Sequence, residues 1–122
     1  MKKKRNYLCI CAGGNVRSVA VAYLVKYKYQ HNAIAAGVDF FGDEEFVANL
    51  MSYAQHIIVV SEEIEIRLKR FLDLYHTRYI PITRIDIGED KWGPQLGPYN
   101  NELMNLAEDL IDKSGLFSPK RS

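Results

Sequence analysis

One short stretch near the N-terminus limits the possible folds of this chain more than any other part of its sequence. An apolar run over residues 8–11 breaks at a pair of glycines and resumes as a helical pattern, with the spacing Cys-x5-Arg-Ser through Cys11, Arg17 and Ser18. A loop that joins a strand to a helix in this way turns backbone N–H groups toward one point, and the helix N-terminus adds its positive end. The stretch therefore predicts a binding seat for a tetrahedral oxyanion. The loop residues expected to bind it are Ala12, Gly13, Gly14, Asn15 and Val16.

The side chains of this pattern have complementary chemistry. A thiol beside a helix N-terminus and a guanidinium is driven toward the thiolate, which makes Cys11 a candidate nucleophile. Arg17 can grip two phosphate oxygens with its planar fork, and Ser18 can donate its hydroxyl to the sulfur. These roles predict phosphoryl transfer through a cysteinyl-phosphate intermediate. The alternative is that Cys11 is a small core residue and Arg17 a solvated residue of a helix.

Strand-like and helix-like segments alternate along the chain. Strands are expected over residues 7–11, 33–36, 57–60 and 79–87. Helices are expected to begin near Arg17, Asp43, Ser61 and either Asn100 or Asn101, the first continuing to about His31 and the last ending at Gly115. The wholly apolar first strand is typical of the centre of a parallel sheet, whereas Pro81 favours an edge position for the last strand. The pattern predicts an α/β fold: a doubly wound, four-stranded parallel sheet with helices on both faces, which binds ligands at the carboxyl ends of its strands.

Length and composition are those of an ordinary globular protein. The 122 residues predict one domain over 1–122, with a basic tail at 1–5 and a C-terminal tail at 116–122. A net charge of +1 gives no reason to expect nucleic acid or membrane as a partner, and no apolar stretch is long enough to predict a signal peptide or a spanning segment. Two cysteines two residues apart suit a reduced compartment, so a cytoplasmic location is expected.

The histidines give no support for a metal site. His31, His56 and His76 are scattered along the chain without the spacing of metal ligands. Neither a metal nor a cofactor is therefore expected.

The motifs together resemble the low-molecular-weight protein tyrosine phosphatases, and within them the short bacterial-type predicted tyrosine phosphatases. The resemblance covers most of the chain: the Cys-x5-Arg-Ser loop, Ala35-Ala36-Gly37 where the family tends to have Ser-Ala-Gly, residues 54–60 before a charged helix, and residues 85–92, which look like the acid-bearing loop. It implies a phosphatase-I-like (flavodoxin-like) three-layer sandwich. It also implies hydrolysis of protein phosphotyrosine or another aryl phosphate, with inorganic phosphate and other oxyanions as ligands and no cofactor.

Three positions depart from the family's pattern. The family usually has an asparagine in a left-handed conformation three residues after the nucleophile, where this chain has Gly14, followed by Asn15. Glycine accepts a positive φ freely, so the loop can still form. Val16 replaces the second loop cysteine of many members, which removes their disulfide protection against oxidation. The Asp-Pro pair around the family's general acid is absent as such.

The general acid is expected among Asp86, Glu89 and Asp90. Asp86 lies within the apolar alternation of the last strand, where it can simply bond to backbone, whereas Asp90 lies in a long loop beside Trp92 and can reach the pocket. Asp90 is therefore favoured, with Asp86 and Glu89 as alternatives.

Aromatic residues in two connections predict the walls of the pocket. Phe40 or Phe41 follows the strand next to the nucleophile strand, and Trp92 or Tyr99 lies in the long loop. Aromatic walls on both sides suit a phenyl ring, which predicts a preference for aryl over alkyl phosphates. Phe40 and Phe41 can equally be residues that cap the core.

The remaining residues help to distinguish this function from others that use the same loop. An arsenate reductase of this fold needs further cysteines, and none follows Cys11. A phosphocysteine carrier of a sugar transport system typically lacks the arginine, so Arg17 speaks against it. The remaining rival is a phosphate-binding module of the same ancestry without turnover, which hydrolysis of para-nitrophenyl phosphate would distinguish from an enzyme.

Overall fold

The computed structural model describes residues 3–89, 91–92 and 97–117. Its strands are β1 (Asn6–Cys11), β2 (Asn32–Gly37), β3 (His56–Val59) and β4 (Ile82–Arg84). Its α-helices are α1 (Arg17–Tyr27), α2 (Glu44–Tyr53), α3 (Glu62–Leu74) and α4 (Asn101–Ser114). Two 3₁₀ turns, η1 (Val38–Phe40) and η2 (Gly97–Tyr99), precede α2 and α4. None of the described helices is long and apolar enough to cross a membrane.

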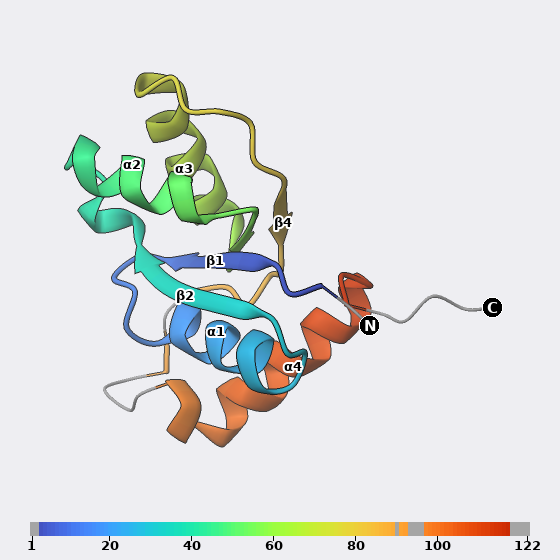
Figure 1. Ribbon diagram of the computed structural model, residues 1–122. Coiled ribbons are helices and arrows are strands. Elements are labelled where there is room, and N and C mark those ends of the chain that lie inside the picture. Colours follow the sequence, from blue (N-terminus) through green and yellow to red (C-terminus); the bar gives the residue numbers. More distant parts are fainter. Residues whose placement is uncertain (1–2, 90, 93–96, 118–122) are drawn as a thin grey trace.

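The strands form one parallel sheet in the order β2-β1-β3-β4. Helices α2 and α3 cover one face, and α1 and α4 cover the other (Figure 1). The predicted doubly wound, four-stranded parallel sheet and its three layers are thus confirmed. The central position of β1 and the edge position of β4 are confirmed with them.

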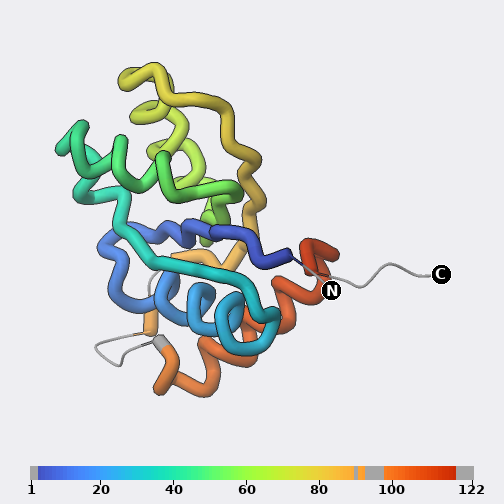
Figure 2. The backbone as a smooth tube through the Cα atoms, viewed as in Figure 1, coloured from blue at the N-terminus to red at the C-terminus, as the bar shows by residue number. Residues whose placement is uncertain are grey.

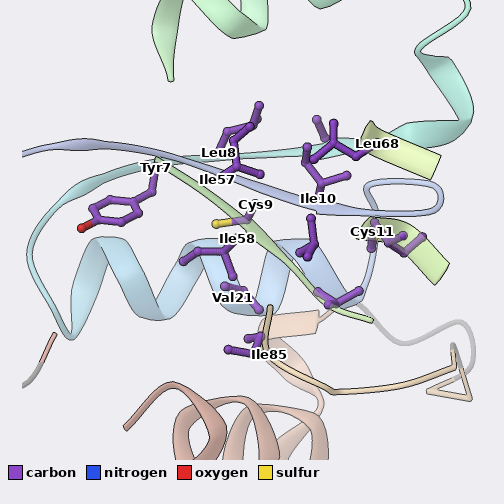
Figure 3. Packing of buried hydrophobic residues seen from close by; sticks show 14 of the residues in the cluster. Tyr7, Leu8, Cys9, Ile10, Cys11, Val21, Ile57, Ile58, Leu68 and Ile85 are labelled. Carbon is purple, nitrogen blue, oxygen red and sulfur yellow. The ribbon is translucent and has the colours of Figure 1, made fainter. Parts of the chain in front are cut away.

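The core is built on the two inner strands because both of their faces are covered. Every residue from Tyr7 to Cys11 in β1 is buried, as are Ile57, Ile58 and Val59 in β3. Alternation along β1 places Leu8 and Ile10 on one side and Cys9 and Cys11 on the other, the side on which α1 packs (Figure 3). The last residue of the strand therefore points toward the helix that follows it.

Side-chain caps explain where three of the helices begin. Asp43 accepts a hydrogen bond from Phe46 N (3.1 Å), Ser61 from Ile64 N (3.3 Å) and Asn100 from Leu103 N (3.0 Å). Each of these helices also carries at least one acidic residue in its first turn. Helix α4 ends as predicted at Gly115, whose φ of 76° is left-handed.

Two predicted boundaries are wrong. Helix α1 ends at Tyr27 rather than near His31, because the chain turns through a left-handed conformation at Gln30 (φ 63°). The last strand is Ile82–Arg84 rather than residues 79–87, and its late start follows from Pro81, which cannot donate to the ladder. Residues beyond β4 still follow β3: Ile85 N donates to Val59 O (2.9 Å) and Ile87 N to Val60 O (3.0 Å).

Glycine is required where the loop after β1 lies on the end of β2. A Cβ at Gly37 would lie 2.4 Å from Gly13 C and 2.6 Å from Ala12 O, which is too close for atoms that are not bonded to each other. Just beyond this contact, Asp39 N donates to Ala12 O (2.9 Å). The end of β2 therefore supports the backbone of the loop directly.

We predict that Gly37→Ala destabilises the protein by about 1–3 kcal/mol, because the added methyl group forces two backbone segments apart. The matched control is Gly42→Ala, since a Cβ at Gly42 would meet nothing within 4 Å. Thermal unfolding of the two variants measures the difference. Equal melting temperatures for both variants would show that the loop can move at no cost.

Candidate active site

Cys11 lies at the floor of the predicted loop with two polar groups close to its sulfur. It is the last residue of β1 and is 3% exposed. Its Sγ accepts a hydrogen bond from Gly14 N (3.2 Å) and lies 3.1 Å from Ser18 Oγ. A thiolate has no proton to give, so in that state the Ser18 hydroxyl must be the donor. The structure thus brings Cys11, Gly14 and Ser18 together.

The neighbouring cysteine has a different environment. Cys9 is fully buried, and that burial raises the pKa of its thiol, with a smaller contribution from Cys11. A thiol held in this way stays protonated at neutral pH. Of the two cysteines, only Cys11 borders the loop between β1 and α1.

Gly14 provides the turn that aims the loop at the sulfur. Its φ is +77°, the left-handed conformation expected at this position. A Cβ here would also lie 2.8 Å from Gly37 N and 2.9 Å from Ala36 C. Both the backbone conformation and the space available therefore require glycine.

The N-terminus of α1 differs from those of the other α-helices. Val16, at its N-cap, makes no side-chain cap, and its first turn contains no acidic residue. The positive end of this helix is thus left to the residues of the loop and to whatever binds there. Asn15, Gly13 and Ala12, which precede it, are at least partly exposed.

Arg17 is a buried cation without a carboxylate partner among the described residues. It is 5% exposed, and its Nη1 donates to the backbone carbonyl of Gly88 (2.5 Å). Its Nε is buried and has no acceptor in the described part of the chain. Burying a charge without a counter-charge is costly, so this arrangement is typical of a site that takes up an anion.

The two phenylalanines predicted as candidates for one wall of the pocket differ in exposure. Phe41 is fully buried and packs edge-on against Phe46 and Phe71, so it belongs to the core and is not available as a wall. Phe40 is 60% exposed at the end of η1, next to Asp39 and its bond to the loop. Of the two residues, only Phe40 remains a candidate for the wall.

Trp92 and Tyr99, the two candidates for the other wall, also differ in exposure. Trp92 is 9% exposed, and its carbonyl accepts a hydrogen bond from Asn100 Nδ2 (3.3 Å), which ties it to the start of α4. Tyr99 is 72% exposed on η2. Lys91 lies over the Trp92 ring at 5.5 Å. Of this pair, Tyr99 offers the larger accessible surface.

The candidates for the general acid are not equivalent in position. Asp90 lies outside the described residues. Asp86 is exposed and forms an ion pair with Arg84 Nε (3.0 Å), whereas Glu89 is exposed immediately after Gly88. Because the Gly88 carbonyl contacts Arg17, the chain at Glu89 lies beside the loop, and the segment from β4 leads toward the start of α1 (Figure 2).

Two features of the site were not found from the sequence. The Gly88 carbonyl is a backbone atom, and the glycine after the last strand was its one available signal. Gly37 belongs to the Ala35-Ala36-Gly37 motif, but that motif carries no signal of its contact with the loop. Among the described residues, no group of three His, Cys, Asp or Glu side chains could hold a metal ion.

Comparison with known proteins supports the architecture. No family model and no curated protein sequence matches the chain. The solved structure of Vibrio vulnificus Wzb in complex with benzylphosphonate is similar, with a TM-score of 0.54 and 16% identity over 92% of this chain and 94% of that chain. Wzb is a low-molecular-weight tyrosine phosphatase. The chain therefore has the fold of the low-molecular-weight tyrosine phosphatases, as its motifs predict.

Proposed function

We propose that this protein is a cysteine-dependent phosphomonoesterase that hydrolyses phosphotyrosine in proteins, or another aryl phosphate. The observation that carries the proposal is the buried Arg17 guanidinium, which has no carboxylate partner among the described residues. Arg17 lies in the first turn of an uncapped helix, and the same turn brings Ser18 to the Cys11 sulfur. Benzylphosphonate, in the Wzb complex, joins an aromatic ring to a phosphonate and so resembles the substrate class proposed here.

In the first step, the Cys11 thiolate attacks phosphorus, a P–S bond forms and the bond from phosphorus to the phenolic oxygen breaks. Arg17 and the loop N–H groups stabilise the charge on the equatorial oxygens. A carboxylic acid protonates the departing phenolate.

In the second step, the same carboxylate takes a proton from water as the water attacks the cysteinyl phosphate. The P–S bond breaks, and inorganic phosphate leaves. Ser18, at hydrogen-bond distance from the sulfur, stabilises the thiolate as it is released.

We expect Cys11→Ser to abolish hydrolysis of para-nitrophenyl phosphate while inorganic phosphate still binds, because the loop N–H groups and Arg17 remain in place. Steady-state assays and calorimetry measure the two effects. The matched control is Cys9→Ala, which alters the neighbouring buried cysteine on the same strand and should keep turnover. Retained turnover in Cys11→Ser would exclude the covalent mechanism. Phosphate binding by the unmodified protein without any turnover would instead indicate the binding module.

Phe40→Ala should lower kcat/KM for a phosphotyrosine peptide several-fold, because roughly one aromatic contact with the phenyl ring is lost. For a matched phosphoserine peptide, whose kcat/KM is expected to be lower from the start, the same variant should cause no change. Tyr79→Ala removes another exposed aromatic side chain, at the start of the segment that leads into β4, and serves as the control. If the unmodified protein hydrolyses both peptides equally well, the aromatic wall does not select the substrate.

Asparagine at the position of the general acid should lower the rate steeply for phenyl phosphate and much less for para-nitrophenyl phosphate, whose leaving group needs little protonation. We expect this signature in Asp90→Asn. The parallel variants Glu89→Gln and Asp86→Asn test the alternatives. An unchanged dependence on the leaving group in Asp90→Asn would transfer the role to whichever of the other two variants shows it.

A further inference from the structure

The backbone of Gly88 links the end of β3 to the arginine of the site. Its N–H donates to Val60 O (3.1 Å), which also accepts from Ile87 N (3.0 Å). Its carbonyl accepts from Arg17 Nη1 (2.5 Å). Val60 is the residue that follows β3, so the N–H of Gly88 is anchored just beyond the sheet while the carbonyl of the same residue holds the guanidinium.

The Gly88 carbonyl binds Nη1 of the guanidinium, and an oxyanion can be bound without this nitrogen. In arginine the Nε–H and one N–H of Nη2 point in the same direction and form a fork for two oxygens, whereas Nη1 lies on the other side of the group. Gly88 engages Nη1, and among the described residues nothing accepts from Nε. The contact therefore leaves the Nε and Nη2 edge to a ligand.

We propose that Gly88 is a positioning residue, whose carbonyl fixes the plane of the Arg17 guanidinium so that the Nε and Nη2 edge faces the oxyanion. The proposal rests on the proposed function only in assigning oxyanion binding to Arg17. A fork must be oriented to bind two oxygens at once, and a long side chain loses less conformational freedom on binding when its orientation is already set.

The left-handed conformation of Gly88 is what directs this carbonyl. Its φ is +91°, a value that L-residues other than asparagine and aspartate rarely adopt. A Cβ at this position would meet nothing within 4 Å. A substitution here therefore acts through the backbone conformation and not through a steric clash.

The chain contains a matched control for this substitution. Gly115, the C-cap of α4, has a φ of +76°, and a Cβ there would also meet nothing within 4 Å. Gly88→Ala and Gly115→Ala should thus impose the same kind of backbone strain, the first beside Arg17 and the second away from the site. Gly88→Asn is the conservative variant, because asparagine tolerates the left-handed region.

The experiment measures the binding of inorganic phosphate by calorimetry, together with the melting temperature and, where there is turnover, kcat and KM. We expect Gly88→Ala to weaken phosphate binding about tenfold and to lower kcat at least as much, since small displacements of a positioning group are costly. Gly115→Ala should lower the melting temperature to a similar extent and leave phosphate binding unchanged. Gly88→Asn should restore most of the affinity, and Arg17→Lys gives the loss expected when the fork is absent.

Inorganic phosphate needs no general acid, so its affinity reports on Arg17 and not on the neighbouring acid-bearing segment. Unchanged phosphate affinity in Gly88→Ala would overturn the proposal. Tighter binding would overturn it as well, because it would show that the carbonyl competes with the ligand for Arg17. If the unmodified protein shows no turnover, the phosphatase assignment fails, while the affinities still decide the role of Gly88.

Discussion

The site depends on one electrostatic constraint, which is that a guanidinium is buried without a carboxylate to neutralise it. Three of the four described α-helices have capped N-termini and acidic first turns, but the helix that carries Arg17 has neither. A helix N-terminus without a cap or an acidic residue keeps the positive field that favours an anion. The features that stabilise the other helices are thus absent at the proposed oxyanion site.

The sheet supplies the geometry that makes this arrangement possible. Because β1 is central and parallel to its neighbours, its carboxyl end is bordered by the ends of both β2 and β3. Gly37 at the end of β2 supports the loop, and the chain after β3 holds Gly88, whose carbonyl reaches Arg17. Residues of the candidate site therefore come from three separate parts of the sequence.

What the sequence could predict follows from how local each signal is. The strand, turn and helix around Cys11 are encoded within a dozen residues, so they predict the loop. The layers follow from the alternation of strands and helices along the whole chain, and the positive φ at Gly14 is what the family resemblance implies. Adjacent aromatic residues give no such signal, since Phe40 and Phe41 differ only in which one points into the core. The contact of the Gly88 carbonyl depends on how two distant segments pack, and no side-chain pattern encodes it.

The environment of the two cysteines also determines how the protein tolerates oxidants. The loop contains Val16 where the resemblance noted in the sequence implies a second cysteine in many low-molecular-weight tyrosine phosphatases. Cys9 lies two residues before Cys11 on the same strand, fully buried, with burial raising the pKa of its thiol. Neighbours of this kind on one strand are poorly placed to form a disulfide, and a protonated thiol does not attack a sulfenic acid. Peroxide that reaches Cys11 would therefore form a sulfenic acid that no other thiol of this chain can trap, and its rescue would depend on thiols from outside the protein.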